Sequence, residues 1–253
     1  MRRCLPTLLV ASLLTASGPT RSAPSLDDRK EKIKTMEASV SPEAVQRKER
    51  SEAVLRAEGV PINKFLPVIE TEKDARRRTK EVVAYRALAL LVVAAKGEGL
   101  EQPVVDRMIA DYGLGRHFTP KEAAFVKTAA PSEHDRIQFV WRYEAAWVML
   151  WALGYVERLE RPIAICDVPR AVQFMRERNT KQFLAGAKLR SMPEVLDQAD
   201  KIYRYHWAVV DARVNGRKAP AALDPGVVME RHYALNWLFG YMEQDWDDIS
   251  TDT

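Results

Sequence analysis

The apolar positions along the chain recur at the three- and four-residue spacing of helices, and no segment alternates apolar and polar residues between hairpin turns. Residues that start helices mark the boundaries. Ser41 is followed by Pro42, and Thr119 with Glu122 has the spacing of a capping box. These patterns predict an all-α protein of about seven helices. The predicted helices cover residues 42–58, 80–96, 102–112, 120–130, 133–156, 192–214 and 225–241, and Asp167 could cap a further short helix at 168–178.

Three of the predicted helices have no polar face. Residues 82–95, 139–156 and 227–241 are apolar around most of the helix. Because a helix that is apolar on every side must be buried on every side, we expect these three to form an inner layer of a single domain. The amphipathic helices expected to cover this layer are 42–58, 120–130 and 192–214.

The few charges inside these apolar helices need partners, because an unpaired buried charge costs several kcal/mol. Arg142 and Glu144 are two residues apart and point about 200° from each other on a helix, so they cannot pair. Arg86 is the only charge in its own apolar run. We therefore predict a buried Arg86–Glu144 pair. Arg142 then requires another acid, such as Glu230 or the acidic C-terminus.

The composition is that of an ordinary globular domain. Of the 253 residues, 47% are hydrophobic and 29% are charged. The formal net charge of +4 falls to about +2 when Arg2 and Arg3 are left out, which is too weak to indicate nucleic acid as a partner. The basic run Arg76-Arg77-Arg78 precedes an apolar helix and is interpreted as a solvated first turn.

The N-terminal sequence MRRCLPTLLVASLLTASGPTRSAPS has the layout of a secretory signal peptide, with two arginines, an apolar run and then small residues. We predict a signal peptide at 1–22, a charged tether at 23–40 and the helical domain at 41–253, in a protein that is periplasmic or secreted. The apolar run is too short to cross a bilayer, so no transmembrane segment is predicted in the mature chain. The alternative is a cytoplasmic protein whose true start lies near Met36.

Motifs that would identify a catalytic or cofactor site are missing. The glycine patterns of dinucleotide and P-loop sites, the GxSxG of hydrolases and the HExxH of zinc proteases are all absent from the sequence. The histidines lie on different segments, and Cys166 reads as a small buried residue. We therefore predict no cofactor and no metal site.

The polar residues of the helix at 192–214 divide between two faces. His206 lies on the apolar face, where a core histidine is the favoured interpretation and a catalytic base the alternative. Asp200, Arg204 and Asp211 share the other face at spacings of four and seven, which predicts an ion-pair ladder on the surface.

The C-terminal sequence DWDDISTDT carries four aspartates and Trp246 close behind an apolar helix. If it is buried, Trp246 would anchor this end with about 2–3 kcal/mol. We predict that the end docks on the domain and closes over a polar site, with its acids meeting Arg142 or Arg231. The alternatives are a solvated acidic end and a site for a hard cation.

Four motifs, WRYEAAWVMLWALG, YRYHWAVVDAR, VVMERHYALNWL and WDDISTDT, occur here in the order in which they occur in a bacterial family known as domain of unknown function 4272. The chain resembles this family from about Arg47 to Thr253. The resemblance implies one helical domain that ends at the chain terminus, and it implies no catalytic residues.

These features favour a module that binds a protein or a small polar ligand. A helical core crossed by paired charges could hold such a ligand or present a surface to a protein. One alternative is a hydrolase-type enzyme in which Glu144 acts with His206 or His232 as general acid and base. Another is a core whose charges only fix helix register. The candidate ligand-binding residues are Arg86, Arg142, Glu144, His206, Glu230, Arg231, His232, Asn236, Trp246 and Asp247.

Overall fold

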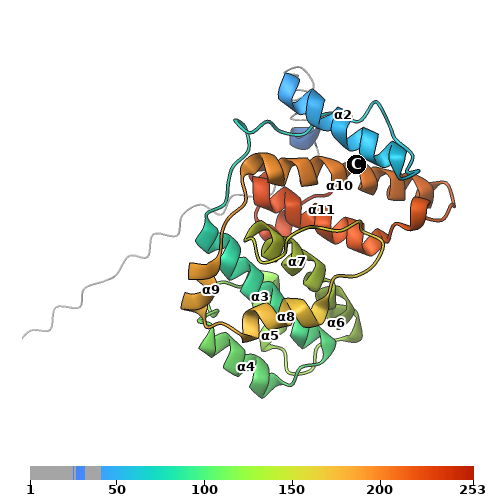
Figure 1. Cartoon of the computed structure of the whole chain (residues 1–253). Coiled ribbons are helices and arrows are strands. Elements are labelled where there is room, and N and C mark those ends of the chain that lie inside the picture. The colour runs from blue at the N-terminus through green and yellow to red at the C-terminus, as the bar shows by residue number, and fades with distance from the viewer. Residues whose placement is uncertain (1–24, 26, 32–40) are drawn as a thin grey trace, which may run out of the picture.

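The computed structural model describes residues 25, 27–31 and 41–253, and these residues form helices and connecting turns without a strand (Figure 1). The all-α prediction is therefore confirmed. The predicted signal peptide, and most of the predicted tether, lie outside the described residues. The helices are α2 (Pro42–Ala57), α3 (Lys80–Glu98), α4 (Gln102–Asp111), α5 (Pro120–Lys127), α6 (Glu133–Val140), α7 (Arg142–Ala152), α8 (Val168–Arg176), α9 (Thr180–Gly186), α10 (Met192–Val214) and α11 (Pro225–Phe239), with 3-10 turns at Pro220–Ala222, Tyr241–Glu243 and Trp246–Asp248.

Capping residues start the helices where the sequence places them. The Thr119 side chain accepts a hydrogen bond from the Glu122 N–H, and the Glu122 side chain accepts one from the Thr119 N–H, so the predicted capping box is confirmed. Asp167 caps α8 as its position suggested. Helix α9 was not predicted, although Asn179 and Gln182 form a second such box at its start.

The segment predicted as one helix at 133–156 is two helices, α6 and α7, which meet at Trp141. The backbone angles of Trp141, φ −58° and ψ −19°, are closer to a 3-10 turn than to an α-helix. Its ring packs so closely on Gly226 of α11 that an added Cβ there would lie 2.4 Å from the ring. Sequence periodicity does not reveal this break, because both halves keep helical spacing.

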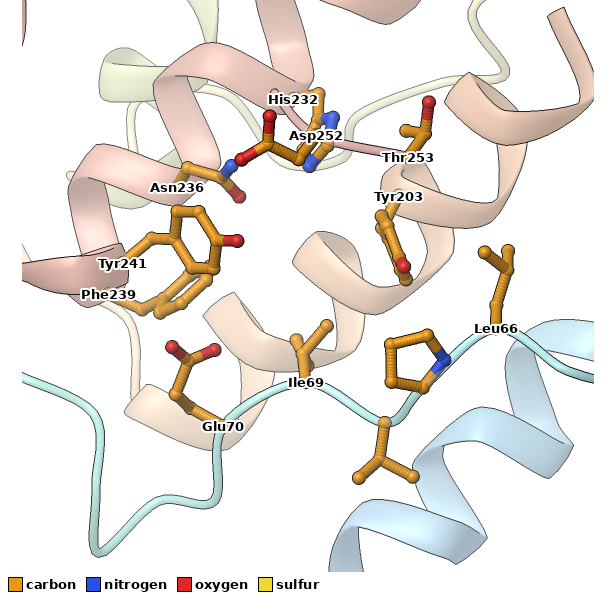
Figure 2. Close-up of a pocket in the computed structure, with 12 residues that line it drawn as sticks. Leu66, Ile69, Glu70, Tyr203, His232, Asn236, Phe239, Tyr241, Asp252 and Thr253 are labelled. Atoms are coloured by element: carbon orange, nitrogen blue, oxygen red, sulfur yellow. The ribbon is translucent and has the colours of Figure 1, made fainter. Parts of the chain in front are cut away.

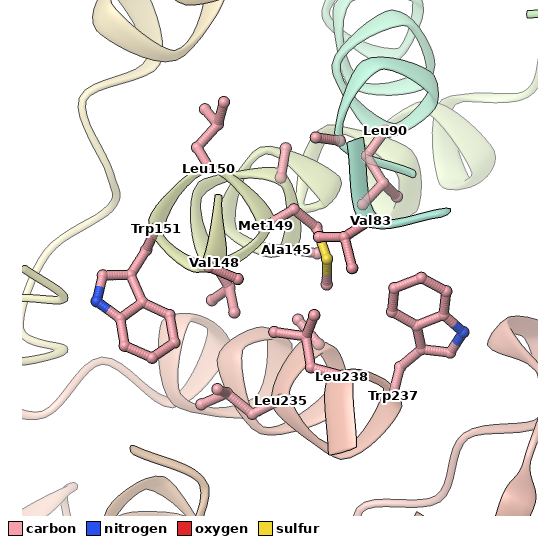
Figure 3. Packing of buried hydrophobic residues seen from close by; sticks show 14 of the residues in the cluster. Val83, Leu90, Ala145, Val148, Met149, Leu150, Trp151, Leu235, Trp237 and Leu238 are labelled. Carbon is pink, nitrogen blue, oxygen red and sulfur yellow. The ribbon is translucent and has the colours of Figure 1, made fainter. Parts of the chain in front are cut away.

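Helices that contact one another follow the order α3, α7, α11, α10 and α2 across the molecule. Figure 3 shows α7 between α3 and α11, with Val83 and Leu90 on one side and Leu235 and Leu238 on the other. No residue of α7 is exposed, and α3 has none exposed between Val83 and Ala94. None of the helices in the described residues is long and apolar enough to cross a bilayer.

The segment of residues 60–79, called the strap below, joins α2 to α3 without forming a helix (Figure 1). Its backbone carbonyls therefore need partners outside the strap. Lys48 Nζ donates to the carbonyls of Lys64 and Leu66, at 2.7 and 2.5 Å. Further along, the Glu70 carbonyl accepts from Arg47 Nη1 at 3.0 Å. Cations of α2 thus hold the strap in place.

The three arginines at the end of the strap do not form a helical turn, so that part of the interpretation was wrong. Arg76 and Arg77 are exposed, as expected. Arg78 is partly buried and donates to the carbonyl of Trp237, at 3.1 Å, and to that of Gln244, at 3.0 Å. Arg77 donates to the Arg190 carbonyl at 2.6 Å. A helix leaves its last carbonyls without partners, so Arg78 stabilises the C-terminal end of α11.

We predict that Gly97→Ala destabilises the protein by about 1–3 kcal/mol, although alanine favours helices over glycine. Helix α6 crosses α3 at this glycine, and an added Cβ would lie 2.9 Å from both the Arg136 carbonyl oxygen and the Val140 nitrogen. The measurement is urea unfolding. The matched control is Gly115→Ala, where no atom lies within 4 Å of the added Cβ. Equal unfolding midpoints for the two variants would contradict the prediction.

Candidate ligand-binding site

Arg86 pairs with Glu122 of α5 and not with Glu144, so the predicted Arg86–Glu144 pair is wrong. The Nη2 of Arg86 lies 2.5 Å from Oε2 of Glu122, and both side chains are buried. Glu122 also belongs to the capping box of α5. The sequence placed this acid at a helix start, and only the packing of α5 on α3 turns it toward the core.

Glu144 pairs instead with Arg231 of α11. Arg231 Nε donates to Glu144 Oε2 at 3.2 Å, and the backbone N–H of Cys166 donates to the other carboxylate oxygen. Arg231 also donates to the Glu160 carbonyl at 2.6 Å. This pair therefore joins α7, α11 and the segment that follows α7.

Arg142 pairs with Glu230, which was one of the two partners predicted for it. Its Nη1 lies 3.0 Å from Oε2 of Glu230, so this pair is confirmed. Burial raises the pKa of the Glu230 carboxyl, and the charge of Arg142 offsets part of that increase. Glu230 and Arg231 are neighbours in the sequence of α11, and each forms its own ion pair with a residue of α7.

In the predicted surface ladder on α10, Asp200 and Arg204 form a buried ion pair, whereas Asp211 is partly exposed and pairs with Arg217. Arg204 donates two hydrogen bonds to Asp200, at 2.9 and 2.6 Å, and both side chains are at most 2% exposed. Helix α2 covers this face of α10 and brings Glu52 within 3.9 Å of Arg204. The four-residue spacing of Asp200 and Arg204 correctly predicted that they pair. Their burial was not predicted, because it depends on α2, which is distant in the sequence.

His206 of α10 and His232 of α11 face each other, with 2.8 Å between their Nδ1 atoms. One nitrogen must donate to the other, which requires at least one ring to be neutral. Burial, together with the charge of Arg213, lowers the pKa of His206 to about 4. Burial also holds the pKa of His232 well below its usual value. Both rings are therefore neutral at pH 7, and the favoured interpretation of His206 as a core histidine agrees with its burial.

A pocket of about 240 Å³ lies between the strap, α10, α11 and the C-terminal residues. We call it the strap pocket. Figure 2 shows His232 and Asn236 on one side of it and Ile69 on the other, with Tyr203 and Tyr241 at its flanks. The lining residues are Leu66, Pro67, Val68, Ile69, Glu70, Tyr203, His232, Asn236, Phe239, Tyr241, Asp252 and Thr253.

The charged groups around the strap pocket are mostly acidic. The carboxylates of Glu70 and Asp252 belong to its wall, and together with burial they raise the pKa of Tyr241. Asp252 pairs with Arg29 at 3.1 Å. No lysine or arginine occurs among the described residues that line the pocket. Its surface is thus mostly apolar and aromatic, with two acids and the neutral polar side chains of His232, Asn236 and Thr253.

The C-terminal residues pack on the domain through Trp246, so the predicted docking is confirmed. Trp246 is 4% exposed, and its ring meets those of Tyr233 and Trp237 edge to face, at 5.2 and 5.3 Å. Arg86 lies 5.0 Å from the centre of the Trp246 ring. Asn236 donates to the Ser250 carbonyl at 2.9 Å, which holds the last residues against the strap pocket.

The sequence had suggested that the acids of this end meet Arg142 or Arg231. No ion pair joins them to either arginine in the described residues, so that prediction is wrong. Asp247 instead accepts a hydrogen bond from the backbone N–H of Lys121 at 3.2 Å, in the first turn of α5. Arg142 reaches the end only through the Trp246 ring, 6.0 Å away. An acid at a helix start interacts favourably with the helix dipole, and this explains the different partner.

The family model described as Domain of unknown function (DUF4272) matches residues 47–249. The chain belongs to the DUF4272 family. The predicted resemblance to this family is thereby confirmed. No curated protein and no solved structure matches the chain.

Three pockets lie beside α11 among the described residues, and four of the ten candidate residues line one of them. His232 and Asn236 line the strap pocket, and Arg231 lines a second pocket of about 250 Å³. A third, of about 310 Å³, is lined by Arg86 and Trp237. The candidates that line none of these three pockets are Arg142, Glu144, His206, Glu230, Trp246 and Asp247.

Of the twelve residues that line the strap pocket, the sequence-based candidates include only His232 and Asn236. The polar lining residues outside that candidate set include Glu70, Tyr203 and Asp252. Glu70 lies in the strap, whose two prolines and apolar residues were a usable signal of an extended segment packed on the domain. In the described part of the DUF4272 chain, no group of three or more histidine, cysteine or acidic side chains is placed to bind a metal ion.

We predict that Glu144→Gln lowers the free energy of unfolding by about 3 kcal/mol, because it leaves Arg231 buried without its counterion. Urea unfolding measures the change. The control is Glu160→Gln, since the Glu160 side chain is 76% exposed and only its backbone carbonyl binds Arg231. An unchanged midpoint for Glu144→Gln would show that this pair does not stabilise the fold.

Acid should destabilise the protein through the histidine pair. The pKa of His206 is about 4 in the folded state and about 6.5 in the unfolded chain, so the unfolded state binds protons first as the pH falls. The free energy of unfolding should therefore decrease between pH 6.5 and 4, by at most about 3 kcal/mol for this residue.

The measurement is urea unfolding at pH 7.5, 5.5 and 4.5 for the wild type, His206→Gln and His134→Gln. The His206 variant should show a smaller decrease with acid than the wild type, because one buried histidine is gone. His134 is exposed, so its variant should follow the wild type. Parallel pH profiles for all three proteins would contradict this assignment.

Proposed function

We propose that the protein is a binding module for a small ligand with an apolar body and a neutral or positively charged polar end, held in the strap pocket. The observation that carries the proposal is the lining of that pocket, which combines aromatic and aliphatic walls with acidic side chains and includes no described lysine or arginine. The proposal treats residues 41–253 as one domain, with α3, α7 and α11 as its inner layer.

The volume of the pocket limits the size of the ligand. At about 30 Å³ for each water-sized unit, 240 Å³ holds about eight non-hydrogen atoms. Pockets for drug-sized ligands usually measure about 300–1,000 Å³. A ligand the size of a single substituted ring or a short branched chain therefore fits best.

The side chains that face the pocket favour an amine or hydroxyl group over an anion. Glu70 and Asp252 supply negative charge, although the pair with Arg29 offsets part of the charge of Asp252. Tyr203 and Tyr241 offer ring faces that attract a cation. His232 is neutral at pH 7, so it adds no positive charge. A carboxylate in this position would meet two acids, which disfavours it electrostatically.

No observation favours the hydrolase alternative. Glu144 is bonded to Arg231 and to the Cys166 N–H, and it lines none of the three pockets beside α11. His232 lines the strap pocket, but its partner is His206 and not a carboxylate. A general acid and base must both reach one substrate, and none of the three pockets beside α11 is lined by Glu144 together with either histidine.

Three ligands of nearly equal size test the proposal. We predict that benzylamine or benzyl alcohol binds the wild-type protein more tightly than benzoate does, as measured by NMR titration at pH 7. Ile69→Trp should fill the pocket and weaken binding of the preferred ligand at least tenfold. Ile137→Trp is the control, because Ile137 is 52% exposed and lines none of these pockets. The proposal fails if benzoate binds best, if none of the three binds, or if both variants bind like the wild type.

A further inference from the structure

The pocket beside Arg231 differs in character from the strap pocket and lies on another face of α11. It has a volume of about 250 Å³, and its walls come from the end of α2, residues 159–162, α10 and α11. We call it the Lys201 pocket. Residues four apart lie on one stripe of a helix, so Arg231 and Leu235 face this pocket while His232 and Asn236 face the other. A ligand in one pocket therefore does not occupy the other.

Five charged side chains line the Lys201 pocket, and three of them are cations. The cations are Lys201, Arg161 and Arg231, and the acids are Glu58 and Glu160. The lining thus has one more positive than negative charge. This balance is the opposite of that in the strap pocket, where both charged lining residues are acids.

The acids of this pocket are already engaged. Glu58 accepts a hydrogen bond from Arg161 Nε at 2.9 Å and another from the Tyr205 hydroxyl at 2.5 Å. Glu160 extends into solvent, where its carboxylate pairs with Arg158 at 3.3 Å. Arg231 is neutralised from the core side by Glu144.

Lys201 is the cation that remains. Among the described residues, no acid lies within 4 Å of its ammonium group, and no hydrogen bond is formed by it. The side chain is half-buried at the wall of the pocket. Desolvation lowers the pKa of its amine, and the charges of Glu58, Asp197 and Glu160 offset part of that decrease. These acids lie beyond ion-pair distance, so a closer counterion would compensate the desolvation of the ammonium group further.

We propose that the Lys201 pocket binds a small monocarboxylate, with the Lys201 ammonium as its counterion and the guanidinium groups of Arg161 and Arg231 adding positive potential. The single excess charge matches a monoanion. A dianion such as succinate or inorganic phosphate would place a second negative charge near Glu58. The volume again corresponds to about eight non-hydrogen atoms.

Propanoate is the probe, and its binding to the full chain is followed by NMR titration at pH 7 with 1-propanol as the uncharged analogue. The wild type should bind propanoate more tightly than 1-propanol, succinate or phosphate. Lys201→Met should weaken propanoate binding at least tenfold, while Lys201→Arg, which keeps the charge, should retain most of it. Lys218→Met is the matched control, because Lys218 is exposed and lies outside the pocket.

The folded state of each variant is checked by thermal unfolding. Lys201→Met should melt close to the wild-type temperature, because it removes a half-buried charge that has no ion pair within 4 Å among the described residues. The inference is overturned if the wild type does not bind propanoate, if Lys201→Met binds it like the wild type, or if a dianion binds more tightly. Ile69→Trp should leave propanoate binding unchanged, which separates this result from the test of the strap pocket.

Discussion

The ion pair between Glu144 and Arg231 is the contact on which the arrangement of the central helices depends. Each side chain lies in a mostly apolar helix, and neither could stay buried alone without cost. By pairing, they fix the register of α7 against α11. Glu144 also accepts from the Cys166 N–H, and Arg231 donates to the Glu160 carbonyl, so the segment after α7 is held by the same two side chains.

This arrangement makes α11 the element around which the pockets form. Its buried faces meet α7 and α10, and its C-terminal end is capped by Arg78 of the strap. The space left beside α10 and the strap carries acids and aromatic rings, whereas the space near the end of α2 carries an excess of cations. A pocket whose charged residues are acids and a pocket with an excess of cations therefore lie on different faces of the same helix.

The strap and the C-terminal end show how segments without long helices become parts of a site. The strap has few partners for its own backbone, so cations of α2 and α10 bind its carbonyls and place Glu70 and Ile69 at the pocket. The C-terminal end is fixed by the burial of Trp246 and by the bond from Asn236 to Ser250. Both segments complete a pocket whose other walls are helices.

The sequence by itself determined the helical class and most helix starts, because capping and hydrophobic spacing act within a few residues. It also predicted that the C-terminal end docks through Trp246, which the structure shows buried. It also indicated that Arg142, Glu144 and Arg86 needed partners inside the protein. Only the tertiary structure decided which partners they found, that Asp200 and Arg204 are buried, and that His206 meets His232. These outcomes depend on which helix covers which face, and that choice is made by packing between segments far apart in the chain, where local patterns carry no information.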